Sequence, residues 1–400
     1  MFKERIKTHH SAMADGKRYL TGMRKVTELL ATGEGAGSNS VIYIHVPFCT
    51  KICTFCNMRR SLQAPTKNYA DLLVQEIKQY AALPYVQETV FDAVYFGGGT
   101  PTTLPTADLK KILRALKESF TFTEDAEFTV ETTVTQLKKE KWMALVEEGV
   151  NRFSVGVQTF HEDGRRLMGR IGSGEAAYEL LGQLKQAGVT VSMDLIYNYP
   201  GQTMEDLYGD LDRIIALDLD GFSMYSLIDM KETKIEQAQS QDNDERMFFA
   251  ISEYMEKAGY RFLELTKMVK RDSYKYIMNR HSGADTLPLG AGAGGSMSGL
   301  AMMNPISLEE YQASVLSFEE RKGMHFAPEY KEIVRFKGDI QTIHLPRNTS
   351  LYENKDVYEK MVEQLVEHGM VKEEEGQFKL TTKGVFWGNT ISRELSSMMK

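Results

Sequence analysis

The chain has 400 residues, of which 42% are hydrophobic and 26% charged, and its formal net charge is −7. This length predicts two or three domains, or one large α/β barrel with an appendage. The average composition excludes wholesale disorder, and the negative charge disfavours a protein that coats nucleic acid. No run of about 18 apolar residues is present, and Met1–Met13 has no apolar core of a secretory signal. We therefore expect a cytoplasmic protein without a membrane span.

Strand-like and helix-like segments alternate from residue 41 to residue 258. The predicted strands are 41–46, 91–96, 127–131, 152–157, 189–195 and 221–226. The predicted helices are 68–83, 106–120, 136–148, 174–187, 203–217 and 243–258. Six such units imply parallel strands, because each helical crossover returns the chain in the same direction. The pattern predicts an α/β fold with a partial (β/α)6 TIM-like barrel. A doubly wound open sheet is the alternative that periodicity leaves open.

The strict alternation ends near residue 260. Residues 261–330 are expected to extend the core and contain the glycine-rich run Gly290–Gly299. Residues 331–400 read as a helix, a β-hairpin around Glu375–Gly376 and a further helix, which resembles a winged-helix unit. Residues 1–40 are polar and end in a Gly/Ser-rich stretch, so we expect an N-terminal arm and linker there. The β/α core would then span residues 41–260.

All three cysteines of the chain lie together. Cys49, Cys53 and Cys56 form C-x3-C-x2-C directly after the first predicted strand. An odd, clustered set excludes a disulfide framework and indicates metal or redox chemistry. Three thiolates suit a [4Fe–4S] cluster with one open iron, which a small molecule can chelate through an amine and a carboxylate. A zinc site with His45 as fourth ligand is the alternative.

Polar residues and glycines recur where the other predicted strands end. Gly97–Thr102 (GGGTPT) follows the second strand, and glycines let backbone amides approach a ligand closely. The strand ends also carry the following polar residues: Glu131, Gln158, Asp194, Tyr225 and Ser226. Each could be a turn or cap residue, but as a set they predict a ligand site at the carboxyl ends of the strands.

The cysteine spacing after YIHVPFC resembles that of the radical S-adenosylmethionine (SAM) superfamily, in which Phe55 fits the usual aromatic position. With GGGTPT, FSVGVQTF and DLIYNYPGQ, residues 40–400 resemble its oxygen-independent coproporphyrinogen oxidase-like branch. The chain has Met58 where the oxidases carry a further Cys, and Tyr274–His281 does not match the His-Asn…Tyr-Trp signature of the haem chaperones. The segments 283–304 and 380–391 are most similar to the anaerobic haem-degrading methyltransferases, the anaerobilin synthases, although those are expected to have His and Trp near Leu265–Thr266.

The resemblance implies a set of cofactor contacts. Cys49, Cys53 and Cys56 would hold the [4Fe–4S] cluster, and no catalytic side chain is assigned. The first SAM would contact Tyr43, Gly98, Glu131 and the glycine-rich stretch near Gly295. A second SAM would contact Phe55, Gly99, Thr100, Gln158, Arg170, Asp194 and Ser226.

The resemblance also implies an activity. A radical SAM C-methyltransferase would open the haem macrocycle under anaerobic conditions, using two SAM molecules, and release iron and a linear tetrapyrrole, with a reduced flavodoxin or ferredoxin as electron donor. His281 and the pair His9 and His10 are weighed as haem ligands, but none is assigned. Two alternatives stay open: a haem-trafficking protein of the same branch, and a radical SAM methyltransferase that acts on another planar aromatic substrate.

Overall fold

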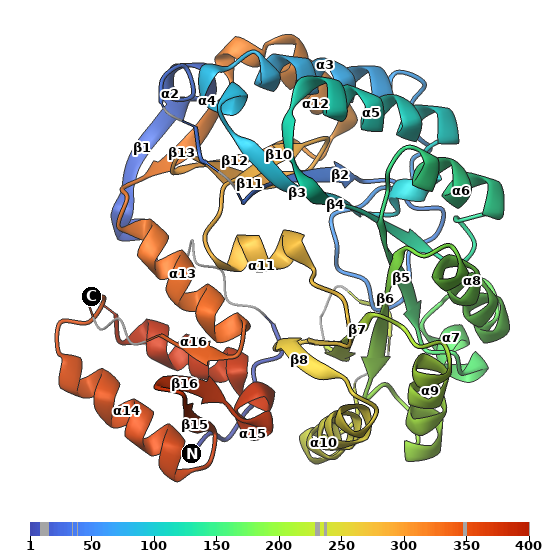
Figure 1. Cartoon of the computed structure of the whole chain (residues 1–400), viewed down its shortest axis with the longest axis vertical. Helices are drawn as coiled ribbons and strands as arrows, with labels where there is room; N and C mark the ends of the chain where they lie inside the picture. The colour runs from blue at the N-terminus through green and yellow to red at the C-terminus, as the bar shows by residue number, and fades with distance from the viewer. Residues whose placement is uncertain are drawn as a thin grey trace.

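The computed structural model describes residues 1–8, 16–33, 35–37, 39–228, 233–235, 238–346 and 350–399. Within these residues, thirteen strands form one sheet in the order β1-β13-β12-β11-β10-β2-β3-β4-β5-β6-β7-β9-β8. Three further strands form a small C-terminal sheet. Figure 1 shows the large sheet curving around α11, with the C-terminal unit at one side.

The strands are β1 (Leu20–Lys25), β2 (Ser40–Val46), β3 (Val90–Gly98), β4 (Thr121–Thr133), β5 (Arg152–Gln158), β6 (Thr190–Tyr197), β7 (Gly221–Ser226), β8 (Arg261–Glu264), β9 (Lys267–Val269), β10 (Thr286–Leu289), β11 (Gly294–Met297), β12 (Leu300–Met303), β13 (Lys322–Phe326), β14 (His344–Leu345), β15 (Val371–Glu374) and β16 (Gln377–Leu380). The α-helices are α2 (Val26–Leu29), α3 (Tyr69–Ala81), α4 (Pro84–Gln87), α5 (Thr106–Ser119), α6 (Lys139–Glu147), α7 (Glu162–Leu167), α8 (Gly174–Gln186), α9 (Met204–Ala216), α10 (Gln241–Lys257), α11 (Lys275–His281), α12 (Leu308–Leu316), α13 (Tyr330–Gln341), α14 (Lys355–Glu367), α15 (Thr382–Phe386) and α16 (Gly388–Ser397). Short 3-10 helices are η1 (Lys17–Tyr19), η2 (Pro101–Thr103) and η3 (Phe318–Glu320).

The six predicted β/α units are confirmed, with β2 to β7 as their strands. These strands are parallel and adjacent in sequence order. In a doubly wound sheet the order of the strands reverses at a switch point. The order from β2 to β7 does not reverse, so it identifies a partial barrel. All seven residues of β5 are buried, as expected for a strand covered on both faces. β10 adds a seventh parallel strand beside β2.

The helices that connect the strands bury one apolar face each. In α5 the buried side chains include Leu109, Ile112, Leu113 and Leu116, the face predicted from the sequence. α9 begins at a capping box formed by Thr203 and Asp206. These helices pack on the outside of the barrel (Figure 1). Because the strands β2 to β7 are parallel, their carboxyl ends meet along one edge.

α11 covers the opposite, amino-terminal ends of the strands. Its first residue, Lys275, donates its backbone N–H to Glu127 Oε2 at 2.9 Å and its Nζ to Asp92 Oδ1 at 3.0 Å. Tyr276 of this helix stacks on Tyr95 of β3, with ring centroids 4.4 Å apart. Since Tyr276 is 3% exposed, its ring fills this end of the barrel.

The prediction of an arm and linker over residues 1–40 is wrong for several of them. β1 pairs with β13 as the outermost strand of the sheet, because Leu20 to Lys25 run antiparallel to Lys322–Phe326. Near the N-terminus, Arg5 donates to Asp244 of α10 at 2.8 Å and to the Phe386 carbonyl at 2.8 Å. The first residues therefore join the barrel to the C-terminal unit, where both termini lie in Figure 1.

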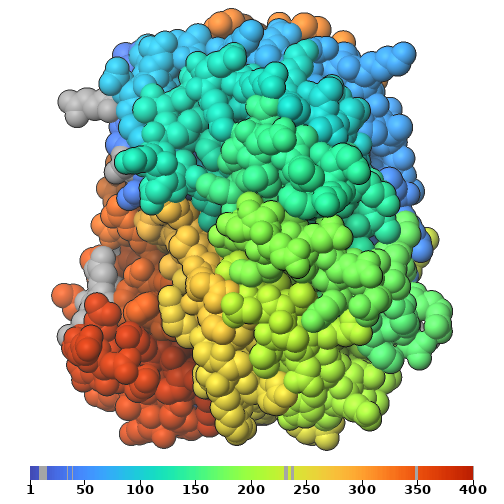
Figure 2. Space-filling model, turned by 45° about the vertical axis from the view of Figure 1, so that its right-hand side comes forward, coloured from blue at the N-terminus to red at the C-terminus, as the bar shows by residue number. Residues whose placement is uncertain are grey.

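The C-terminal unit has the predicted helix, hairpin and helix. β15 and β16 pair through Glu374 and Gln377, and the two turn residues, Glu375 and Gly376, have φ of 52° and 75°. Two positive φ values are typical of a type I′ hairpin turn. β14 adds a third strand. Figure 2 shows the segment of β8, β9 and α11 (yellow) between this unit (red) and the barrel helices (green). Of the helices described, none combines the length and apolarity that a membrane crossing requires.

Candidate functional site

The cysteine loop leaves β2 at the carboxyl edge of the barrel and is fixed by backbone hydrogen bonds. Cys49 N–H donates to the Ser61 carbonyl at 2.9 Å, and Cys56 N–H donates to the Cys53 carbonyl at 3.2 Å. Thr54 donates from its backbone N–H to the Met168 carbonyl and from its hydroxyl to the Leu167 carbonyl. The loop is therefore held at its middle by the carboxyl-terminal end of α7.

The three thiols are free and half-buried. Burial raises the pKa of Cys49, and the neighbouring Cys56 and Cys53 sulfurs raise it further, so the three thiols are close enough to influence one another. Among the described side chains, no group of three His, Cys, Asp or Glu surrounds a single metal position. Each thiolate of a four-iron cluster binds a different iron, so three thiolates leave the fourth iron open. The donor set therefore fits a [4Fe–4S] cluster.

His45 is unsuited to the zinc alternative because both ring nitrogens already have partners. Its Nε2 lies 3.0 Å from the Arg59 carbonyl, which only accepts, so Nε2 carries the proton. Nδ1 then accepts from the Tyr43 hydroxyl at 2.9 Å. Burial lowers the pKa of His45, which keeps the ring neutral. His45 thus connects the predicted SAM contact Tyr43 to the cysteine loop.

The GGGTPT segment packs against the start of the cysteine loop. Gly99 N–H donates to the Val46 carbonyl and Thr100 N–H to the Phe48 carbonyl, both at 2.8 Å. The Thr100 hydroxyl lies 3.8 Å from Cys49 Sγ. Gly98 has φ 111°, and a Cβ there would lie 2.7 Å from the His45 ring. Only glycine therefore allows this close approach of backbone and imidazole.

Glu131 lies beside the same glycines. It accepts from the Tyr95 hydroxyl at 2.5 Å and from Gly98 N–H at 3.2 Å. Burial raises the pKa of Glu131 to about 7, and the nearby Asp194 carboxylate contributes. Burial also raises the pKa of Asp194, although Lys267 opposes this effect. Glu131 on β4 and Asp194 on β6 lie on the two strands that flank β5. A cationic ligand between these two buried carboxyl groups would stabilise their charged forms.

Arg170 joins the cysteine loop to β5. Its Nη1 donates to Cys53 Sγ at 3.1 Å, and its Nη2 donates to the Gly156 carbonyl. Gln158, at the end of the same strand, has φ 75°, a strained value for a residue with a side chain. Ser226 is 7% exposed, and its hydroxyl is buried without a hydrogen-bond partner. Such an unpaired group suits a site that a ligand completes.

Phe55 lies between the second and third cysteines and packs into an apolar cluster. This cluster contains Met168, Ile196, Tyr199 and Leu227. Ile196 is in β6 and Leu227 directly follows β7. The cysteine loop therefore contacts the carboxyl ends of β6 and β7 as well as the GGGTPT segment.

One predicted contact lies elsewhere. A Cβ on Gly295 would lie 2.3 Å from the Thr286 carbonyl, and Thr286 pairs with Val41 at the start of β2. Gly295 is therefore beside the amino-terminal end of β10, away from the cysteine loop. Gly290 and Gly292, from the same glycine-rich run, are the ones that pack against His45. The role of Gly295 stays a prediction that this placement does not favour.

Glu76 is a buried carboxylate that holds the glycine-rich loop, and it was not predicted from the sequence. Glu76 is 0% exposed and accepts from Gly290 N–H at 2.7 Å and from Arg321 Nη1 at 2.5 Å. It also accepts from the Tyr311 hydroxyl at 2.7 Å and the Asn304 amide at 2.8 Å. Glu76 looks in sequence like an ordinary surface glutamate of α3. Its partners lie more than 200 residues away, so no local signal marks it.

A second missed group fills the barrel interior. Arg152 of β5 makes two hydrogen bonds to Asp272, at 2.7 and 3.0 Å, and its guanidinium lies 4.1 Å from the Tyr274 ring centroid. Lys267 lies 3.4 Å from the same Asp272 and donates to the Ser192 hydroxyl at 2.5 Å. The sequence carries one sign of this group, because Arg152 is a charged residue at the start of a mostly apolar strand.

His281, which was weighed as a haem ligand, is not brought to the site. His281 Nε2 lies 3.0 Å from Glu264 Oε2, at the side of α11. His9 and His10 lie outside the described residues. The described part of the chain therefore gives no support to His281 as a haem ligand.

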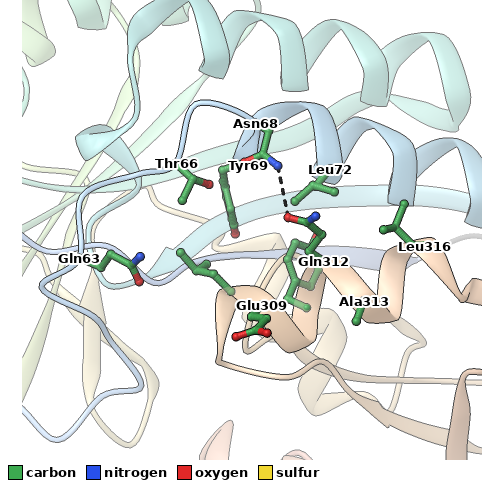
Figure 3. Close-up of a pocket in the computed structure, with 11 residues that line it drawn as sticks. Gln63, Thr66, Asn68, Tyr69, Leu72, Glu309, Gln312, Ala313 and Leu316 are labelled. Atoms are coloured by element: carbon green, nitrogen blue, oxygen red, sulfur yellow. Dashed lines mark hydrogen bonds between the residues drawn. The ribbon is translucent and has the colours of Figure 1, made fainter.

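A pocket of about 400 Å³ lies outside the barrel, between α3 and α12. Figure 3 shows Asn68 donating to Gln312 across it, with Tyr69 pointing inward. The Tyr69 hydroxyl donates to the His45 carbonyl at 2.8 Å, so the wall of this pocket supports the strand that carries the cysteines. None of the predicted site residues lines the pocket, and we place the site at the barrel edge instead.

Comparisons with known proteins agree with this geometry. The model of the radical SAM superfamily matches residues 43–214. The chain is 28% identical over 378 residues to anaerobilin synthase of Escherichia coli O157:H7, covering 90% of this chain and 84% of that protein. It is 27% identical over 374 residues to heme chaperone HemW of Lactococcus lactis, covering 87% and 95%. The structure of coproporphyrinogen III oxidase (HemN) of E. coli aligns with TM-score 0.77 at 24% identity, covering 92% of each chain.

These findings agree with the resemblance drawn from the motifs. The matched family model begins at Tyr43, within the strand that leads to the cysteines, and the fold over almost the whole chain is that of HemN. The family uses a [4Fe–4S] cluster and SAM, for which the three free thiols and the glycine segment provide a fitting place. Residues 43–214 therefore form a radical SAM domain, in a chain whose fold is similar to that of HemN.

Proposed function

We propose that the protein is a radical SAM C-methyltransferase that opens the haem macrocycle anaerobically and releases iron and a linear tetrapyrrole. One observation carries the proposal. The cysteine loop, the GGGTPT segment and the polar strand ends meet at one barrel edge in a chain similar over 90% of its length to an anaerobilin synthase.

When bound, the cluster and SAM supply one-electron radical chemistry. Cys49, Cys53 and Cys56 would hold the cluster. Glu131 would bind the cationic part of the first SAM, because its carboxyl group has Tyr95 and Gly98 as fixed donors and gains from a positive neighbour. Arg170 would stabilise the Cys53 thiolate through the contact at 3.1 Å.

The second SAM is proposed at the strand ends opposite the glycine segment. The unpaired Ser226 hydroxyl supplies a donor and acceptor there, and the strained Gln158 holds its amide at the end of β5. Phe55 supplies an aromatic face from the cysteine loop. These groups orient a ligand and exclude water, which is the part of radical catalysis that the protein performs.

The test is anaerobic reconstitution with SAM, a reductant and haem, followed by absorbance and mass spectrometry. Loss of the Soret band with an opened, methylene-bearing tetrapyrrole is the expected result. Cleavage of SAM with haem intact would refute the haem-degrading role and would favour another planar aromatic substrate. A matched control is Cys53→Ala, which should lose the cluster iron and both reactions.

A haem-trafficking protein is the second candidate, because the similarity to heme chaperone HemW is of the same level, 27% over 87% of this chain. The two candidates differ in what happens to haem. A chaperone would bind haem stoichiometrically and leave its Soret band and SAM unchanged, whereas the enzyme would consume both. A single anaerobic incubation with analysis of both compounds separates the two.

A further inference from the structure

The segment that carries the three cysteines is unusual in its charge. From residue 35 to residue 70 the chain contains no aspartate or glutamate, although the protein has 55 acidic residues and a net charge of −7. The same segment contains Lys51, Arg59, Arg60 and Lys67. The cysteine loop is therefore a basic region of an acidic protein, and a local field of this kind attracts anionic partners.

The loop is open to solvent directly beside the cysteines. Residues 51 and 52, which precede Cys53, and residues 57 and 58, which follow Cys56, are all exposed. Arg60 has a different role, since it donates to the Cys56 and Met58 carbonyls and holds the loop together. A protein seated on the loop would thus contact residues that adjoin the cysteines in sequence.

Large apolar side chains lie among the exposed cations. Ile52, Met58 and Met303 expose 39%, 51% and 58% of their surface. Arg59 Nη1 lies 2.8 Å from Met303 Sδ, which connects the cysteine loop to the end of β12. Apolar side chains with charged neighbours are the usual composition of a protein docking surface, with the apolar part as its centre and the charges as its rim.

We propose that this surface, defined by Lys51, Ile52, Met58, Arg59 and Met303, is where a small acidic electron-carrier protein docks. The inference rests on the proposed function, in which each cleavage of SAM requires one electron from outside. The carrier would lose one electron and the cluster would gain it, with no bond broken and no proton transferred. The opposite charges would guide the encounter, and the methionine and isoleucine side chains would be buried in the complex.

An anionic small molecule, such as the carboxylates of a haem, is the rival occupant of the same cations. It would pair with Lys51 and Arg59 but would gain nothing from the exposed Ile52 and Met58. Charge and apolar variants therefore give different patterns for the two occupants, and both patterns are read as binding rather than as turnover.

The experiment measures the dissociation constant between the cluster-loaded protein and a flavodoxin, without oxygen, by titration calorimetry. The variants are Lys51→Glu, Arg59→Glu, their combination and Met58→Ala. The control is Lys360→Glu, which makes the same charge change at an exposed lysine on α14. Titrations at about 0.05 and about 0.5 M salt separate the electrostatic part, since salt screens exposed charges.

The double charge reversal is expected to weaken flavodoxin binding at least about tenfold at low salt, with little difference left at high salt. Met58→Ala should weaken binding at both salt concentrations, and the control should bind like the wild type. SAM cleavage with dithionite should be unchanged in every variant, which keeps a failure of the docking proposal separate from a failure of the radical SAM function. Unchanged flavodoxin binding in the double variant would overturn the proposal. A double variant that binds haem more weakly but flavodoxin normally would assign the surface to the anionic small molecule instead.

Discussion

Glu76 allows a quantitative test of how the glycine-rich loop is held against the site. Its carboxylate accepts from Gly290, Tyr311, Asn304 and Arg321, and it has no exposed surface. The substitution Glu76→Gln keeps the shape of the side chain but removes the charge and turns one acceptor into a donor. The new amide nitrogen would face groups that are themselves donors.

The expected cost follows from the burial of the ion pair. The Arg321 side chain is 7% exposed and that of Glu76 is 0% exposed, so the remaining guanidinium would have no compensating charge. Removal of one partner of a buried ion pair costs about 3–5 kcal/mol. We therefore expect Glu76→Gln to lower the free energy of unfolding by about 3 kcal/mol or more. The control Glu253→Gln, in a pair with both side chains more than 70% exposed, should cost about 0.5 kcal/mol or less.

The assay is urea unfolding of the cluster-free protein followed by circular dichroism, combined with hydrogen exchange at the Gly290 amide. Glu76→Gln should speed exchange at Gly290, because that N–H donates to the carboxylate. A loss of less than about 1 kcal/mol, with unchanged exchange at Gly290, would refute the idea that this buried pair holds the loop.

Three further predictions concern the site itself. Because burial raises the pKa of Glu131 to about 7 from 4.5, its contribution to stability is full below about pH 4.5 and is lost as the pH rises through 7. In Glu131→Gln the free energy of unfolding should lose about 3 kcal/mol of its change between these pH values. An unchanged dependence of that free energy on pH would contradict the raised pKa of Glu131. Gly98→Ala should lower the free energy of unfolding by about 1–3 kcal/mol, because φ is 111° and the new methyl group would meet the His45 ring. An unchanged free energy in the same unfolding assay would exclude this contact. Arg170→Ala should lower the reduction potential of the loaded protein in a redox titration, since a cationic donor to Cys53 is lost, and an unchanged potential would argue against that contact.

Much of the barrel could be predicted from the chain alone, because the relevant signals are local. The strands β2 to β7 have apolar bodies and the helices repeat their apolar residues at helical spacing, so the six units were found within a few residues of their ends. β4 is the largest difference, since it begins at Thr121 and not at residue 127. Its first residues pair with the start of β3 and leave a bulge, and periodicity does not indicate such an irregular register.

The unpredicted parts depend on contacts between distant segments. β1 becomes a strand because β13, about 300 residues later, offers an edge to pair with. Arg152 and Asp272 form a buried pair across 120 residues, and either residue alone looks like a surface charge. Gly295 was selected from a glycine-rich run in which pairing with β12 turns it away from the site. The pairing of the strands decides which glycine of the run contacts His45. The amino-acid composition of the run does not reveal that pairing.

The most direct measurement of the central claim uses SAM deuterated in its methyl group, with haem and a reductant, in anaerobic single incubations of the cluster-loaded protein. Mass spectrometry of the products would then report the fate of both compounds. We expect an opened tetrapyrrole that carries deuterium from the methyl group, together with released iron. Intact haem recovered beside cleaved SAM, or haem and SAM both unchanged, would contradict it.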